Sequence, residues 1–297
     1  MNLYSFRSSN IRKTWLMFSL FLVVVIFVGW IFSYAYNDPV ILYIAVFFSL
    51  FTNLVAYWKS DKIALAMSGA QKAEDKKFGE IYNIVENLSI TAGVPMPSIY
   101  IINDPSPNAF ATGRNPKNAS IAITTGLLDI LDRSELEGVI AHELSHIKNY
   151  DILISTVAVV LVGLISIISD FFMRMTLFGR GGDDNKGKNP VIMIVAIAVA
   201  VLAPILGTIM RLSISRRREF LADASGVLLT RYPEGLASAL EKISKTGPSL
   251  KPHNATAHLF ISSPFRADSN QRKTPWLAKL FMTHPPIDER IKSLRQV

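Results

Sequence analysis

Four stretches of the chain carry long apolar runs that contain no charged residue. They cover residues 15–36, 40–58, 152–169 and 191–210. Because about 20 apolar residues cross the hydrocarbon core of a bilayer as a helix, each run is long enough to span a membrane. Only residues 37–39 separate the first two runs, so they predict a tight membrane hairpin. The pattern therefore predicts four transmembrane helices arranged as two hairpins.

Buried core helices are the alternative interpretation of these runs. It is weak for the first pair, which is long and free of charge. It carries more weight for the second pair, because Asp170 and Arg174 shorten the third run. The connection between the third and fourth runs contains four basic residues. A shallow hairpin that never fully crosses the membrane is therefore a further alternative for this pair.

Shorter amphipathic segments fill the rest of the chain and predict a water-facing part. Apolar residues at helical spacing predict helices over residues 73–92, 216–230 and 234–245. Isoleucine-rich runs bounded by turn residues predict strands over residues 98–103 and 119–124. The expected fold class is therefore mostly α with a small β-sheet (α+β).

Two local signals predict where further helices begin. Ser134 and Glu137 have the spacing of a capping box, so a helix is expected to begin at Ser134 and to continue past residue 140. Pro286 suits the first position of a short final helix, because the missing N–H of proline costs nothing there.

The apolar runs divide the chain into four parts. Residues 1–58 form an N-terminal membrane hairpin and residues 152–210 a second one. Residues 59–151 and 211–297 remain outside the membrane.

Basic residues near the ends of the spans predict the orientation of the chain. Arg12 and Lys13 precede the first span and Lys59 and Lys62 follow the second, whereas the connection between them has no basic residue. Lys and Arg accumulate in cytosolic segments. The N-terminus and both water-facing parts are therefore expected in the cytosol.

Composition agrees with a membrane protein and excludes several chemistries. Hydrophobic residues make up 50% of the chain and charged residues 18%, and the mean hydropathy is +0.31. Soluble chains carry about 25% charged residues. There is no cysteine, which excludes disulfides, zinc–thiolate sites and cysteine nucleophiles. The net charge of +8 could indicate a nucleic-acid partner. That interpretation is rejected, because the arginines of residues 211–218 adjoin an expected membrane span, where they favour binding of anionic lipid headgroups.

Residues 142–146 (HELSH) carry the candidate chemistry, because they form an HExxH sequence on an expected helix. His142 and His146 lie on one helix face, about 6 Å apart along its axis, so both imidazoles can reach one zinc ion. Glu143 lies beside them and can accept a proton from zinc-activated water. A helix that merely exposes two histidines is the alternative.

A hydrolytic zinc site needs a third protein ligand and one open position for water. The metzincin spacing is excluded, because Asn149 and Ile152 occupy its glycine and histidine positions. The candidates downstream are Glu219, Asp223, His253, His258 and His284. Glu219 is preferred, because two membrane crossings return it to the side of His146. An ion pair with the adjacent arginines 216–218 is its alternative role. Asp223, one turn later, can accept a hydrogen bond from a ligand histidine.

Several motifs, in their order and spacing, resemble the HtpX family of bacterial membrane zinc metallopeptidases. They are residues 108–113 (NAFATG), 142–151 (HELSHIKNYD), 215–223 (SRRREFLAD), 257–260 (AHLF) and 284–286 (HPP). The resemblance covers nearly the whole chain, including the opening hairpin. The CAAX prenyl-protein proteases of eukaryotic membranes are more distantly similar.

The resemblance implies a role for each motif. His142, His146 and Glu219 would hold one Zn²⁺ per chain, Glu143 would be the general base, and Asp223 would support a ligand histidine. His284 would stabilise the oxyanion, although a histidine before Pro285 also suits a simple turn. The substrate backbone would add as a β-strand to a segment of this chain. That segment contains Asn108, Ala109, Phe110, Ala111 and Thr112.

Other polar residues are ambiguous. His253 and His258 lack metal-ligand spacing with the HExxH sequence and are expected to be structural. Arg290 either binds a carboxylate, of a substrate or of the site, or lies on the surface as a lone arginine on a helix usually does.

These observations predict four transmembrane helices joined to a cytosolic, zincin-like catalytic domain. The expected function is a zinc endopeptidase that cleaves misfolded or damaged membrane proteins, or other unfolded polypeptides, on the cytosolic side. The resemblance implies the bacterial cytoplasmic (inner) membrane and a role in stress-related quality control. A catalytically inactive zinc-binding membrane scaffold and a CAAX-type prenyl-protein protease are the alternatives. Glu143 argues against the scaffold, because a structural zinc site needs no base.

Overall fold

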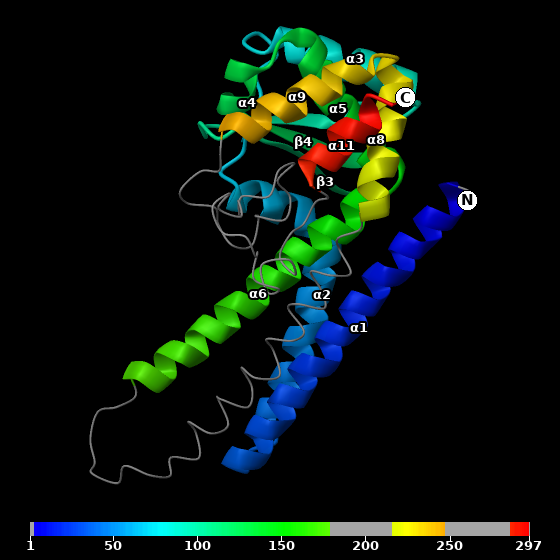
Figure 1. Ribbon diagram of the computed structural model, residues 1–297. Helices are drawn as coiled ribbons and strands as arrows, with labels where there is room; N and C mark the ends of the chain where they lie inside the picture. Colours follow the sequence, from blue (N-terminus) through cyan, green and yellow to red (C-terminus); the bar gives the residue numbers. More distant parts are fainter. Residues whose placement is uncertain (1–2, 179–215, 247–285, 297) are drawn as a thin grey trace, which may run out of the picture.

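The computed structural model describes residues 3–178, 216–246 and 286–296. Long helices extend away from a domain in which further helices surround a small sheet (Figure 1). Most described residues are helical, and the sheet has four strands in mixed orientation. The expected α+β class is confirmed to this extent.

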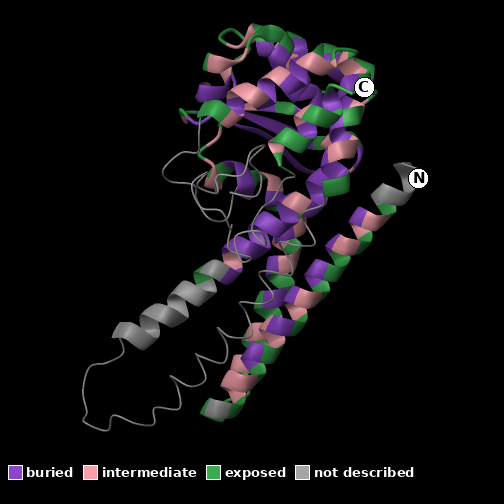
Figure 2. Ribbon diagram, viewed as in Figure 1, coloured by how far each residue is buried: buried purple, intermediate pink, exposed green. Residues whose placement is uncertain are grey.

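The two helices expected from the first apolar runs are present and lie side by side. They are α1 (Leu3–Tyr36) and α2 (Val40–Met67), and they contain candidate membrane spans of 27 and 28 residues. Asn37 has a positive φ of 50°, and Asp38 Oδ1 accepts a hydrogen bond of 2.9 Å from the Val40 N–H. This tight turn reverses the chain. Exposed residues recur along both helices (Figure 2), and many of them are large and apolar, which suits contact with lipid.

The third apolar run lies in α6 (Asp151–Phe178), which packs against α1, α2 and the sheet. It follows α5 (Arg133–Lys148) after a break at which the chain bends by 86°, and the two helices meet the criterion for a membrane span as a pair. The fourth expected span, residues 191–210, lies outside the described residues. Within the described ranges, two helices qualify as membrane spans, or three when the bent pair is counted.

The sheet places one strand beside the expected site. Its strand order is β1-β2-β4-β3. The strands are β1 (Gln71–Lys72), β2 (Ser98–Ile102), β3 (Ala109–Asn115) and β4 (Asn118–Thr124). β2 and β4 are parallel, whereas β1 with β2 and β3 with β4 are antiparallel. The two strands expected from isoleucine-rich runs are therefore present, and β3 lies at an edge of the described sheet.

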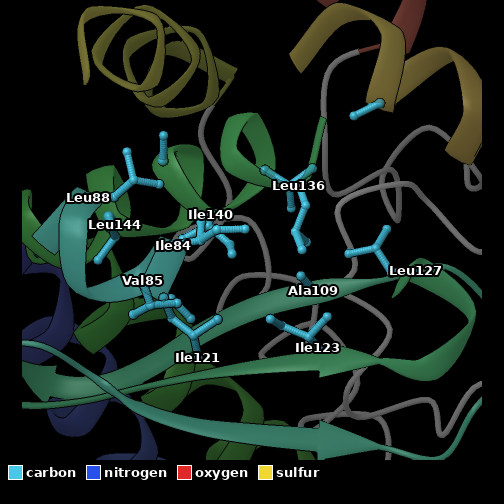
Figure 3. Close-up of a cluster of buried hydrophobic side chains, with 14 of the residues drawn as sticks. Ile84, Val85, Leu88, Ala109, Ile121, Ile123, Leu127, Leu136, Ile140 and Leu144 are labelled. Carbon is cyan, nitrogen blue, oxygen red and sulfur yellow. The ribbon is translucent and has the colours of Figure 1, made fainter. Parts of the chain in front are cut away.

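Helix α5 lies at the centre of the domain, against β3 and against α3 (Gly79–Ala92), α8 (Arg216–Thr230) and α9 (Pro233–Thr246). The short helix α4 (Thr125–Ile130) packs on β4, and α11 (Ile287–Leu294) packs on α8 and α9. Ile140 and Leu144 of α5 belong to the same buried cluster as Ile121 and Ile123 of β4 (Figure 3). This apolar contact fixes α5 on the sheet, and with it the HExxH sequence.

The start of α5 differs from the sequence prediction. Asp132 and Glu135 form the capping box, two residues before the expected pair of Ser134 and Glu137. Both pairs have the required spacing, so tertiary contacts decide between them. Glu135 is buried and accepts hydrogen bonds of 2.6 Å from Ser238 and from Lys242 of α9.

Two other helix boundaries also differ. α3 begins at Gly79 rather than at residue 73, because Gln71 and Lys72 pair with β2 as a short strand. Pro286 precedes the first residue of α11 as its N-cap instead of occupying that position.

Candidate metal centre

Three side chains from two helices lie close together, two of them buried and one half-buried. His142 Nε2 and His146 Nε2, both on α5, are 3.1 Å apart. Glu219 on α8 brings its two carboxylate oxygens to 3.8 Å from His142 Nε2 and 3.7 Å from His146 Nε2. One ligand atom from each residue lies within 4.8 Å of the others. The chain thus brings together the two motif histidines and the preferred third candidate.

A close approach of the two helices makes this arrangement possible. A Cβ atom on Gly226 of α8 would lie 3.1 Å from the His142 backbone nitrogen. Glycine at this position lets α8 pack directly on α5, which carries Glu219 to the histidines. In the sequence, Glu219 was preferred because it follows the expected fourth span. The contact at Gly226 is the physical reason that Glu219 reaches the histidines.

The spacing of these atoms fits a metal of tetrahedral preference. Ligand atoms about 2.0–2.1 Å from a tetrahedral ion lie roughly 3.3 Å from one another. The two histidine nitrogens, 3.1 Å apart, lie close to that value, and the two Glu219 oxygens lie 3.8 and 3.7 Å from one nitrogen each. Two imidazoles and one carboxylate leave a fourth position for water, as hydrolytic sites require. The residues present therefore fit a catalytic metal.

A buried ion pair supports the first ligand, His142. Its Nδ1 lies 2.9 Å from Asp223 Oδ1, as the sequence anticipated for that acid. Arg290 from α11 binds both oxygens of Asp223, at 2.6 and 2.9 Å. Arg290 is fully buried, so the alternative of a surface arginine is wrong and the site's own acid is its partner.

This contact sets the charge of Asp223. Burial alone would raise the pKa of Asp223, but the charge of Arg290 and the bond to His142 outweigh it and lower the pKa to about 2. The carboxylate is thus ionised at neutral pH. It can hold the Nδ1 proton of His142 and leave Nε2 facing the metal position.

The second ligand, His146, has a matching support that the sequence analysis missed. His146 Nδ1 lies 3.0 Å from Asp151 Oδ2, just past the break between α5 and α6. Tyr150, with a positive φ of 60°, turns the chain there and returns Asp151 to the histidine. The spacing of five residues gave no helical signal, because the break lies between them.

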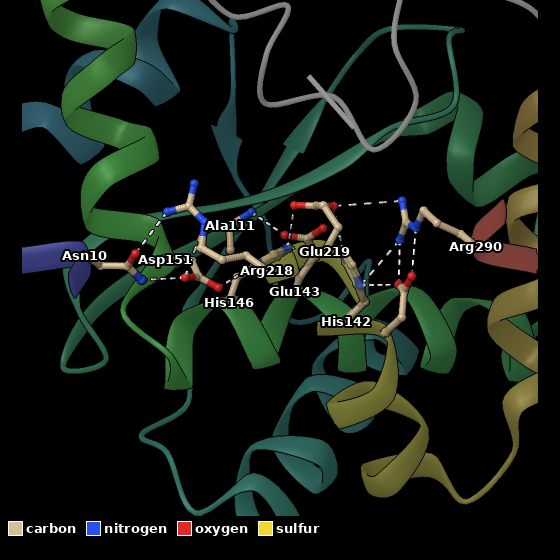
Figure 4. A network of polar contacts seen from close by, with 10 residues as sticks. Asn10, Ala111, His142, Glu143, His146, Asp151, Arg218, Glu219 and Arg290 are labelled. Atoms are coloured by element: carbon tan, nitrogen blue, oxygen red, sulfur yellow. Dashed lines mark hydrogen bonds and ion pairs between the residues drawn. The ribbon is translucent and has the colours of Figure 1, made fainter. Parts of the chain in front are cut away.

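Asp151 also connects the metal centre to the first membrane helix. Asn10 of α1 donates a hydrogen bond of 2.6 Å to Asp151 Oδ1, and Arg218 of α8 donates one of 3.1 Å to Asn10 Oδ1 (Figure 4). Burial alone would lower the pKa of His146, but Asp151 and Glu219 raise it to about 9. No sequence pattern pointed to Asn10, which lies 141 residues from its partner.

Glu143, the expected base, faces the edge strand of the sheet. Its Oε2 accepts a hydrogen bond of 2.7 Å from the Ala111 N–H of β3. Its side chain is buried beside the two histidines, and burial raises the pKa of Glu143 above its usual range. A carboxylate of this kind can exchange a proton more readily near neutral pH.

Comparisons with known proteins agree with this geometry. Residues 75–297 match the family described as Peptidase family M48. The chain belongs to peptidase family M48. A Protease HtpX homolog from Caldanaerobacter subterraneus is 46% identical over 302 residues, covering 99% of this chain and 98% of the relative. Those from Dictyoglomus turgidum and Streptococcus gordonii are 47% and 41% identical, covering 99% and 98% of this chain and 94% and 98% of the relatives.

A solved structure of lower sequence identity has a similar fold. The crystal structure of S. mikatae Ste24p is similar with a TM-score of 0.51 and 20% identity, covering 98% of this chain and 67% of that one. At this identity the likeness concerns the fold. The family match and the HtpX relatives indicate a metallopeptidase, and two of the described helices are long and apolar enough to cross a membrane. This M48 chain is therefore a membrane metallopeptidase, as the motifs implied.

The expected substrate-binding segment of this M48 peptidase adjoins Glu143. Ala109, Phe110, Ala111 and Thr112 lie in β3, and Asn108 precedes it. The N–H groups of Ala111 and Gly113 point away from β4, since they donate to Glu143 and to Thr156. The same edge therefore faces the metal centre. His284, His253 and His258 lie outside the described residues.

Proposed function

We propose that this M48 peptidase is a zinc endopeptidase with His142, His146 and Glu219 as its metal ligands. The three donor side chains, whose ligand atoms lie within 4.8 Å of one another, carry the proposal. Zinc suits them, because two imidazoles with one carboxylate is a donor set of hydrolytic zinc sites. Bound zinc would polarise the scissile carbonyl and lower the pKa of a water molecule to about 7.

Glu143 is the base in this proposal. It accepts the proton of the attacking water and passes it to the leaving amine. The N–H of Ala111 holds its carboxylate in place, which supports a fixed direction for proton transfer. His284 is proposed to donate a hydrogen bond to the oxyanion, and the loss of such a donor typically costs about 10²–10³ in rate.

The substrate is proposed to bind as an extended strand along β3. An edge strand offers outward N–H and C=O groups that an unfolded segment can pair with, whatever its sequence. Ala109 and Ala111 share this outward edge, because alternate residues of an antiparallel strand point the same way. Since the Ala111 N–H donates to Glu143, a peptide would pair with the backbone of Ala109 and with the carbonyl oxygen of Ala111. A peptide there would pass next to Glu143. The need for an extended backbone favours misfolded or unfolded polypeptides as substrates.

The centre is proposed to work at the cytosolic surface of the bacterial inner membrane, in a chain with four spans. Arg12 and Lys13, which precede the apolar run within α1, and Lys59 and Lys62, which follow that of α2, support this orientation. Asp151 contacts His146 and begins α6, so the centre adjoins a helix that contains an apolar run. This position suits the loops and ends of membrane proteins as substrates.

The test compares Glu143→Gln with Glu137→Gln in zinc-loaded, detergent-purified full-length protein. Glu137 lies on the same helix but pairs with Arg133 at the surface, so it is a matched control. Cleavage of casein, of an unfolded membrane protein and of a prenylated peptide is measured with and without chelator. We expect wild type and Glu137→Gln to cut, Glu143→Gln to retain zinc without cutting, and chelator to stop all cleavage.

Other results would point elsewhere. Equal cleavage by wild type and Glu143→Gln would refute the role of Glu143. If all three proteins hold zinc and none cuts, the inactive scaffold is favoured. Cleavage restricted to a prenylated peptide would favour the prenyl-protein protease.

A further inference from the structure

A cavity lies where the membrane helices meet the sheet. Its volume is about 440 Å³, within the usual range for small-molecule sites. Residues of α1, of α2, of the start of α6 and of the β3–β4 turn all line it. The residues used below are Ile11, Trp15, Phe18, Arg114, Lys117 and Leu153.

This cavity lies at the level where the apolar runs begin and end. Trp15 and Phe18 open the apolar run of α1, and Leu153 opens that of α6. Trp58, which ends the run of α2, lines an adjoining cavity of about 410 Å³. Tryptophan prefers the interface between hydrocarbon and water. The cavity therefore faces the layer of lipid headgroups.

The backbone of β3 directs an arginine into this layer. The pairing of β3 with β4 shifts register between Gly113 and Asn115, so Arg114 is the extra residue of a bulge. Bulges re-aim side chains. Gly113 has a φ of 140°, and a Cβ there would overlap the Asn118 carbonyl oxygen, so the local geometry needs glycine.

Arg114 rests on an aromatic ring instead of a carboxylate. Its guanidinium carbon lies 4.1 Å from the centre of the Trp58 ring. Among the described residues, no acid forms an ion pair with Arg114 or Lys117. Lys59 and Lys62 line the adjoining cavity with a single acid, Asp61. The local charge is thus positive and fits an anion.

The lining combines this charge with apolar surface. Trp15 is exposed and Ile11 is half-buried, and both lie over the buried Phe18 and Leu153, whereas Lys117 is exposed at the tip of the turn. A free phosphate would use only the basic part of the cavity, and an uncharged chain only the apolar part. A phospholipid uses both, and the surrounding bilayer supplies it.

We propose that this cavity binds one anionic phospholipid, with its phosphate between Arg114 and Lys117 and an acyl chain along Ile11 and Trp15. Since β3 also faces Glu143, the lipid would anchor the strand that carries the expected substrate edge. The site does not depend on zinc or on proteolysis, so it can be tested separately from the proposed activity.

The test is a binding titration on delipidated full-length protein in detergent. The probes are brominated phosphatidylglycerol and brominated phosphatidylcholine, which quench nearby tryptophans such as Trp15. The variant Arg114→Gln/Lys117→Gln removes two charges, and Lys245→Gln/Lys292→Gln removes two exposed charges on α9 and α11. In Figure 1 neither of these helices lies beside α1 or α2.

We expect saturable quenching that is stronger for phosphatidylglycerol. The Arg114→Gln/Lys117→Gln variant should bind it roughly thirtyfold more weakly, as expected for two lost basic contacts. The α9/α11 control and the charge-conserving variant Arg114→Lys/Lys117→Arg should remain near wild type. If the double glutamine variant does not fold, Lys117→Gln alone should weaken binding about fivefold.

Three results would overturn the proposal. One is equal affinity for the two lipids, and another is wild-type affinity in the folded glutamine variants. The third is displacement of the lipid by glycerophosphoglycerol at equal concentration, because a headgroup without chains would then suffice and the site would be one for free phosphate esters.

Discussion

Replacing Asp151 by Asn should weaken zinc binding without unfolding the protein. The change keeps the shape of the side chain but removes the charge that holds His146 Nδ1 at 3.0 Å. Loss of such an outer partner costs about 10- to 100-fold in metal affinity. That range equals about 1.4–2.7 kcal/mol. The upper part is expected here, because Asp151 is buried and also binds Asn10 at 2.6 Å.

The pH dependence gives this prediction a second readout. Asp151 helps to raise the pKa of His146 to about 9 in the metal-free protein. Protonated His146 stabilises the metal-free fold fully below pH 6.5, and this contribution is lost as the pH rises towards 9. Zinc must displace that proton, so its affinity should rise about tenfold per pH unit up to roughly pH 9. In Asp151→Asn the pKa of His146 should be lower, so the rise in zinc affinity should end at a lower pH.

The assay is competition with a chromophoric zinc chelator between pH 6 and 9.5, alongside thermal unfolding. Asp129→Asn, an exposed change on α4, is the matched control. If Asp151→Asn binds zinc as tightly as the control at every pH, then Asp151 does not position His146 and the reasoning fails.

Three further changes test the neighbouring contacts. Arg290→Met should lower the free energy of unfolding by about 3–5 kcal/mol, because it leaves the buried Asp223 carboxylate without its partner. Lys292→Met is the control, and equal melting temperatures of the two variants would contradict this prediction. Because Arg290 holds the pKa of Asp223 at about 2, the ionised carboxylate stabilises the wild-type protein above about pH 4. This stabilisation is lost as the pH falls towards 2. Acid unfolding of Arg290→Met should therefore begin at a higher pH than that of wild type. Gly226→Ala should cost about 1–3 kcal/mol and reduce zinc content by separating α8 from α5, whereas Gly79→Ala, with open space around it, should do neither.

Local patterns in the sequence determined part of the site and much of the fold. Two histidines four residues apart share a helix face in any fold, so the HExxH sequence alone placed His142 and His146 together. The first two apolar runs likewise predicted α1 and α2, and isoleucine-rich runs predicted β2 and β4. These features depend on periodicities of a few residues, which a single sequence displays.

Contacts between distant segments were decided by tertiary packing. The capping box is formed by Asp132 and Glu135 instead of the predicted Ser134 and Glu137, because α9 supplies partners for Glu135. The burial of Arg290 depends on Asp223, which lies 67 residues away.

The support of His146 shows the same limit most clearly. Asn10 and Asp151 are 141 residues apart, and only the packing of α1 beside α6 brings them together. Sequence periodicity carries no signal for such a pair, because its energy comes from burial and hydrogen bonding that exist only after the helices have packed. The sequence alone thus determined which chemistry the chain carries, and the tertiary structure decided which residues hold that chemistry in place.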